Sequence, residues 1–120
     1  MSHYNAAGHG IKHDQGKLKW HLLPMQYLQG VVRVLMFGAK KYDEHNWRKG
    51  MPWSQPHNAA IRHLAAFMTG EDIDPETGES HIDHAICCLI FLRAFVADYP
   101  QLDDRYSSQT KTPATDQSRG

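Results

Sequence analysis

The chain has 120 residues, with 13 lysines and arginines against 13 aspartates and glutamates, so its formal net charge is zero. That length suits one domain, and the balanced charge gives no indication of stable nucleic-acid or membrane binding. The cysteines Cys87 and Cys88 are adjacent and are not expected to form a disulfide with each other. Reduced thiols and the absence of an apolar stretch in residues 1–20 predict a cytoplasmic protein without a signal peptide or membrane span.

Residues 1–23 show no helical period and are expected to form an N-terminal arm or loop. From Met25 to Tyr42, apolar residues recur every three or four positions, which predicts a first helix. Pro24 suits its first turn.

A second helix is predicted to begin at Ser54, as its N-cap, and to stop at Gly70. A third is predicted after Ser80, whose hydroxyl would cap it, with Asp83 at the capping-box spacing. The body of this third helix, residues 85–97, is apolar almost all round and is expected to be the most buried element.

No segment alternates with the period of a strand, so residues 24–100 are predicted to form an all-α domain. The apolar stripes are too wide for a three-helix monomer to cover. We therefore expect a small helical bundle completed by self-association, as a homodimer or homotetramer. Residues 101–120 have almost nothing to bury and are predicted to be a disordered tail.

Carboxylates and imidazoles are concentrated just before and within the start of the third predicted helix. Five acids lie in residues 70–79, and His81 and His84 follow three positions apart on one helix face. Neutral imidazoles at this spacing can share a cation with carboxylates from a facing segment. Glu71 ends the second helix and His63 lies two turns earlier, so both are expected to approach these histidines.

Three other interpretations of this stretch remain. The acids could form an ordinary solvated loop, and Asp83 is better explained as a helix cap than as a ligand. A structural zinc site of His63, His81, His84 and Cys88 is the third. A calcium loop is excluded, because a loop starting at Asp72 would have its glycine at position seven instead of six.

A second group of side chains is cationic or aromatic. Arg62 stands beside His63 in the middle of an otherwise apolar helix, where a guanidinium could hold a phosphate. Lys41 ends the first helix, where a lysine also complements the helix dipole. Trp47 and Trp53 offer faces for stacking a base, although large aromatic residues in a small domain are equally expected in its core.

These segments together resemble a known family. "HDQGKLKWHLLP" (13–24), "VLMFGAKKYDEHNWRKGM" (34–51), "NAAIRHLAAFMTGEDIDPETGESHIDHA" (58–85) and "LIFL" (89–92) are similar to the phage dATP/dGTP diphosphohydrolases, relatives of the MazG-like all-α nucleoside triphosphate pyrophosphatases. The resemblance covers residues 12 to about 96.

The resemblance implies hydrolysis of purine deoxynucleoside triphosphates (dATP/dGTP) to the monophosphate and pyrophosphate, in phage nucleotide-pool remodelling in the host cytoplasm. It also implies an Mg²⁺ or Mn²⁺ cofactor and a nucleotide site to which the arm contributes. The implied roles are catalytic for His63 and Glu71, metal-binding for Glu71, Asp74, His81 and His84, and nucleotide-binding for Lys17, Lys41, Asn58, Arg62 and Trp47.

The sequence departs from the broader MazG-like pattern, which has ExxE on one helix and ExxD on the next. At those helical positions this sequence has Arg62, His63 and Ala66, then His81 and His84, and the histidines could shift the metal preference towards Mn²⁺ or Zn²⁺. One alternative to the MazG-like enzyme follows from this departure, and a second is independent of it. One is an HD-type phosphohydrolase, for which the adjacent pair His13 and Asp14 lies in the arm. The other is a non-catalytic helical module held by the structural zinc site.

Overall fold

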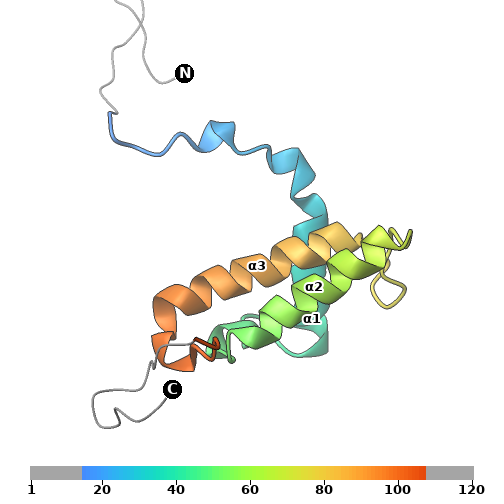
Figure 1. The fold of residues 1–120 in the computed structure, drawn as a ribbon. Coiled ribbons are helices and arrows are strands. Elements are labelled where there is room, and N and C mark those ends of the chain that lie inside the picture. The colour runs from blue at the N-terminus through green and yellow to red at the C-terminus, as the bar shows by residue number, and fades with distance from the viewer. Residues whose placement is uncertain (1–14, 108–120) are drawn as a thin grey trace, which may run out of the picture.

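The computed structural model describes residues 15–107, which contain three α-helices and no strand (Figure 1). The helices are α1 (Gln29–Lys41), α2 (Ser54–Met68) and α3 (His81–Asp98). Helices α2 and α3 lie side by side and run antiparallel, and α1 crosses them and packs against α3. The predicted all-α fold is confirmed for this part of the chain. None of its helices is long and apolar enough to cross a membrane.

Helix α1 begins at Gln29, four residues later than the periodicity predicted. Met25–Tyr27 instead form a 3₁₀ turn, in which the Leu28 N–H donates to the Met25 carbonyl. Met25 is 63 % exposed, so its side chain gains little from burial that would stabilise a longer helix. A second 3₁₀ turn, Trp20–Leu22, precedes this one in the arm.

The start of α2 is capped from a distant part of the chain. Ser54 lies in the first turn of the helix, whereas Trp53 occupies the N-cap position that was predicted for Ser54. The Asp104 carboxylate accepts hydrogen bonds from the backbone N–H and the hydroxyl of Ser54. A carboxylate thus satisfies a free donor of the first turn, as a capping side chain does.

This contact changes the boundary of the predicted disordered tail. Pro100–Leu102 form a 3₁₀ turn, and the Leu102 carbonyl accepts a hydrogen bond from the Trp53 N–H. Residues 101–107 are therefore part of the fold, because they cap and hold the start of α2. Residues 108–120 of the predicted tail, and residues 1–14 of the arm with the His13–Asp14 pair, lie outside the described residues.

Helix α3 begins as predicted, with the Ser80 hydroxyl accepting a hydrogen bond from the Ile82 N–H at 3.0 Å. The predicted capping box is not formed. No hydrogen bond among residues 15–107 joins the Asp83 carboxylate to the Ser80 N–H. The carboxylate instead lies against Gly30, where an added Cβ would overlap it. The lack of a side chain at Gly30 therefore lets α1 approach the first turn of α3 closely.

The core of the described residues is small, and its buried apolar members are Val31, Trp53, Ala60, Ala85, Cys87 and Phe95. Helix α3 is not buried all round as predicted, since Leu89 and Ile90 are 53 % and 42 % exposed. The apolar stripe of α3 is wider than the surface that α1 and α2 cover. Completion of the bundle by further copies stays a prediction.

Candidate metal centre

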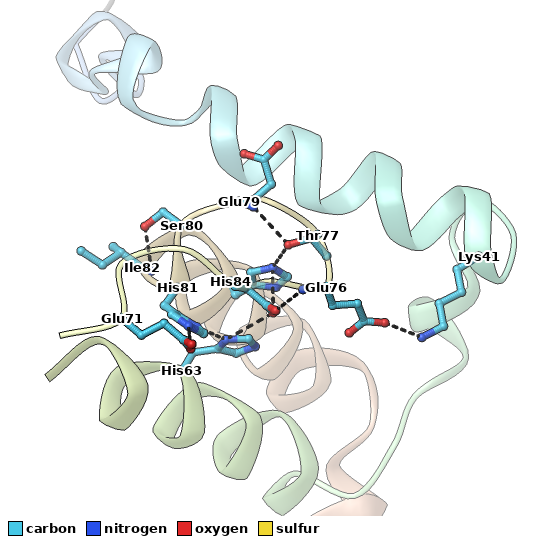
Figure 2. A network of polar contacts seen from close by, with 11 residues as sticks. Lys41, His63, Glu71, Glu76, Thr77, Glu79, Ser80, His81, Ile82 and His84 are labelled. Carbon is cyan, nitrogen blue, oxygen red and sulfur yellow. Dashed lines mark hydrogen bonds and ion pairs between the residues drawn. The ribbon is translucent and has the colours of Figure 1, made fainter. Parts of the chain in front are cut away.

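The candidate site lies where α2 ends and α3 begins (Figure 2). Gly70, with a φ of 104°, stops α2 and turns the chain into the acidic loop of residues 71–80. The loop folds back on itself, because the Asp74 N–H donates to the Glu79 carbonyl at 2.9 Å. At its base, the His81 N–H donates to the Asp72 carbonyl at 3.0 Å. These bonds hold the middle of the loop over the first turn of α3.

His63, Asp74 and His81 form the metal group: one ligand atom of each lies within 4.8 Å of the other two. These side chains come from α2, from the loop and from the first residue of α3. The two Nδ1 atoms of His63 and His81 are 2.9 Å apart, and Asp74 Oδ2 is 4.0 Å from His63 Nδ1. Two imidazole nitrogens and a carboxylate oxygen suit a divalent first-row cation, so the residues present fit a metal ion.

Glu71 contacts the opposite nitrogen of His81. Its Oε1 is 2.6 Å from His81 Nε2, and the His81 side chain is only 6 % exposed. A carboxylate that accepts the Nε2–H leaves the Nδ1 lone pair facing the metal group. Glu71, which the resemblance implied to be both ligand and catalytic residue, thus lies behind His81 and outside the three-residue group.

His84 lies beside the metal group, one turn along α3 from His81. Its ring stacks on the His63 ring, with centroids 4.4 Å apart. His84 Nε2 is 3.4 Å from Asp74 Oδ2 and 2.6 Å from the hydroxyl oxygen of Thr77. Thr77 was not identified from the sequence. Nothing in the pattern distinguishes it from an ordinary turn residue before a glycine.

The surroundings of His63 favour its neutral form. Burial lowers the pKa of His63 below its ordinary value of 6.5, and His84 and His81 lower it further, whereas Asp74 opposes this effect. A neutral imidazole is the form that binds metal ions and accepts protons. His63 is therefore neutral at neutral pH, and a cation that binds the metal group would take the place of the proton shared between the two Nδ1 atoms.

Cys88, the fourth residue of the predicted structural zinc site, does not belong to the metal group. Burial raises the pKa of its thiol, which disfavours the thiolate that zinc requires. Three protein donors would leave coordination positions open, which is typical of catalytic metal sites. Closed structural sites have four protein donors.

Two of the implied phosphate-binding cations lie near the site. Lys41 forms an ion pair with Glu76, with Nζ 3.1 Å from Oε2. The Glu76 N–H donates in turn to Asp74 Oδ1 at 2.8 Å, so Lys41 is connected to the metal group through the loop. Arg62 is exposed on α2 next to His63 and is close enough to lower its pKa.

The structure does not bring the other implied nucleotide-binding residues to the metal group. The Asn58 amide contacts its neighbour His57. Trp47 stacks on Phe91 of α3 with ring centroids 4.5 Å apart, which agrees with a packing role. Lys17 lies on the arm, which leads away from the helices.

Comparison with known proteins bears on the same residues. Residues 7–105 match the family described as "dATP/dGTP diphosphohydrolase, N-terminal". A protein named dATP/dGTP diphosphohydrolase from Salmonella phage PMBT28 is 35 % identical over 111 residues, which cover 92 % of this chain and 38 % of that relative. The chain thus spans well under half the length of the relative, and no solved structure matches it. The family match includes every residue of the metal group and most of the chain, so this chain belongs to the dATP/dGTP diphosphohydrolase family, whose N-terminal part it matches.

Proposed function

We propose that the protein hydrolyses purine deoxynucleoside triphosphates, dATP or dGTP, to the monophosphate and pyrophosphate, in phage nucleotide-pool remodelling. The observation that carries this proposal is the meeting of His63, Asp74 and His81 in a member of this family. The substrate class is supported by the printed name of the phage relative.

The metal group is proposed to hold one divalent cation through His63 Nδ1, His81 Nδ1 and an Asp74 oxygen. Bound there, a divalent cation supplies a Lewis acid for phosphate oxygens and lowers the pKa of water. Two imidazole donors favour Mn²⁺ over Mg²⁺, and Zn²⁺ fits the same set. Glu71 orients His81 through its Nε2–H and is assigned a positioning role.

His84 is proposed to take the proton from the attacking water, at Nε2. That atom lies beside the metal group, 3.4 Å from the Asp74 carboxylate, and would exchange its contact with the Thr77 hydroxyl for the attacking water. The sequence prediction assigned His84 as a metal ligand. The two roles differ in outcome, because loss of a ligand weakens metal binding and loss of a base lowers kcat at saturating metal.

The nucleoside is proposed to occupy the cavity beside the site. This cavity of about 490 Å³ lies between α1, the loop after it and α3, and its walls include Leu35, Trp47 and Phe91. Its volume is in the range of small-molecule pockets, which have apolar walls and a few polar groups. Cys87 also lines it, one helical turn after His84, and the phosphates are proposed to extend from the cavity towards the metal group. Arg62 and Lys41 are the phosphate-binding candidates on this chain.

The proposal is tested by incubating the protein with each of the four dNTPs and Mg²⁺ or Mn²⁺ and measuring phosphate with and without inorganic pyrophosphatase. Phosphate that is released only with the coupling enzyme, from dATP or dGTP, supports the proposed reaction. Direct phosphate release would show that another bond is cut. The absence of release with every substrate and metal would refute the proposed function.

A further inference from the structure

The loop after α1, residues 42–48, forms one wall of the cavity in which the nucleoside is proposed to lie. Helices α1 and α3 line the rest of this cavity with apolar side chains such as Leu35 and Phe91. The hydroxyl, charged and amide side chains of the lining all come from the loop, and they are Tyr42, Asp43, Glu44, His45, Asn46 and Arg48. A side chain that forms strong hydrogen bonds to a base in the cavity therefore belongs to this cavity loop.

Asn46 is the member of this group that is best placed to do so. The other five side chains are exposed, whereas Asn46 is half-buried. His45 and Arg48 already contact each other, since Arg48 Nε donates to His45 Nδ1 at 2.9 Å. The Asn46 backbone N–H donates to the Asp43 carbonyl, but the side-chain amide has no hydrogen-bond partner among residues 15–107. That amide thus keeps its donors and its acceptor for a ligand.

The backbone that carries Asn46 is held by packing in a conformation that the sequence alone does not favour. Asp43 and His45 have φ values of 149° and 63°, which residues other than glycine rarely adopt. Such conformations cost free energy and cluster where a chain segment contacts a ligand. Trp47, the next residue, stacks on Phe91 of α3 with ring centroids 4.5 Å apart. This contact fixes the cavity loop to α3 beside the cavity.

A side-chain amide that can rotate is able to pair with either purine base. On the edge formed by N1 and the group on C6, adenine has an acceptor at N1 and a donor in its amino group. Guanine reverses this order, with a donor at N1 and an acceptor at O6. A primary amide presents one donor and one acceptor side by side, and half a turn about its last bond exchanges them. The Asn46 amide, without a protein partner to fix it, is free to make this exchange.

We propose that Asn46 is the specificity-determining residue of the cavity, and that its amide binds the N1–C6 edge of either purine in opposite orientations. The inference rests on the proposed function, because that function places the nucleoside in this cavity. It gives a physical reason why one cavity would accept both dATP and dGTP. A carboxylate at the same position would only accept hydrogen bonds, so it would pair with N1–H and the 2-amino group of guanine but meet the N1 lone pair of adenine.

The base contact is tested without hydrolysis, by NMR titration of the metal-free full chain with deoxyadenosine and with deoxyguanosine. These nucleosides have no phosphates, so their affinity reports the cavity and not the metal group. Wild type should bind both, with affinities within about 10-fold of each other, because each base forms two hydrogen bonds to the amide. Asn46→Leu, which keeps a similar size without the polar groups, should weaken binding of both by about 10-fold or more.

Asn46→Asp is the sharper variant, because it is nearly isosteric and its effect is measured as a ratio, which does not depend on the fraction of folded protein. It should raise the affinity for deoxyguanosine relative to deoxyadenosine by about 10-fold or more. Lys49→Gln is the matched control and should keep the wild-type ratio, since Lys49 is exposed on the same 3₁₀ turn and does not line the cavity.

Three results would overturn the inference. They are wild type that binds neither nucleoside, Asn46→Leu that binds both as wild type does, and Asn46→Asp that keeps the wild-type ratio.

The same variants distinguish this inference from the proposed reaction. In the coupled phosphate assay, Asn46→Asp should raise kcat/KM for dGTP relative to dATP by about 10-fold or more, and Lys49→Gln should not change the ratio. If no dNTP is hydrolysed but the nucleosides bind as expected, the proposed function fails and the base contact stands. If dATP and dGTP are hydrolysed with the same ratio by wild type and Asn46→Asp, the role of Asn46 fails and the proposed function stands.

Discussion

Glu71→Gln is the substitution that separates a positioning role of Glu71 from the ligand and catalytic roles implied by family resemblance. Glu71 Oε1 is 2.6 Å from His81 Nε2, a bond from an imidazole N–H to a charged acceptor. A hydrogen bond to a charged group contributes about 1.5–3 kcal/mol and a neutral one about 0.5–1.5 kcal/mol. The glutamine keeps an acceptor oxygen but loses the charge, and its amide can also donate to His81 and favour the wrong tautomer.

Removing such a partner of a ligand histidine typically lowers metal affinity 10–100-fold. We expect Glu71→Gln to weaken Mn²⁺ and Zn²⁺ binding by that factor, or about 1.4–2.7 kcal/mol, with kcat at saturating metal within a few-fold of wild type. Calorimetric titration of the metal-free protein gives the affinity, and initial rates across a metal series give kcat. Asp98→Asn, an exposed acid at the far end of α3, is the control and should leave metal affinity unchanged.

Two results would refute this reasoning. A variant that binds metal like wild type yet shows no turnover would make Glu71 the catalytic base, as the resemblance implied. A loss of affinity beyond about 10⁴-fold would make it a direct ligand, since that exceeds the usual effect of an outer partner.

The remaining predictions address the base, the metal and the C-terminal cap. His84→Ala should lower kcat at least 100-fold at saturating metal, while calorimetry should give the metal affinity of wild type. A large loss of metal affinity would show instead that His84 is a metal ligand. Chelation should abolish dNTP hydrolysis and leave the helical circular dichroism, whereas collapse of that signal would support the structural zinc interpretation. The Ser54 hydroxyl lowers the pKa of Asp104 below 3.8, so the cap stabilises the fold above that pH and is lost as pH falls through the folded-state value. Asp104→Asn should therefore lower Tm at pH 7, and the difference should shrink as the pH falls below 3.8; an equal difference at every pH would contradict this.

Periodicity and capping residues were sufficient to predict the three helices, because they depend on local sequence. Ser80 caps α3 and Gly70 follows the end of α2, as expected for these residue types. The cap of α2 could not be predicted, since Asp104 lies 50 residues from Ser54 in the chain. Asp83 was misassigned for the same reason: its neighbour Gly30 comes from another helix.

The sequence predicted which residues form the candidate site better than it predicted how their side chains are arranged. The i, i+3 spacing placed His81 and His84 on one face of α3, and both now lie at the site. Spacing could not tell which nitrogen of His81 would face the metal group, because that depends on the Glu71 contact across the loop. The stacking of Trp47 on Phe91 is likewise a tertiary contact that no local pattern specifies.

Two of the five acids of the loop form ion pairs with α1. Glu79 and Glu76 pair with Arg33 and Lys41 on α1, at 3.0 and 3.1 Å. Such exposed pairs contribute little stability singly, but two of them attach the loop to α1 at separate points. Asp74, between the histidines and these pairs, has no lysine or arginine partner within 4 Å among residues 15–107.

Asp74 is thus the loop acid beside the histidines of the metal group whose charge no lysine or arginine neutralises in residues 15–107. Its Oδ1 is held by the Glu76 N–H, so the carboxylate is oriented before any ion arrives, and Oδ2 faces the imidazoles. Preorganisation of this kind removes part of the entropic cost of binding. The concentration of carboxylates in this loop therefore has a physical explanation: some anchor the loop to α1, and Asp74 is the carboxylate that they hold in position beside His63 and His81.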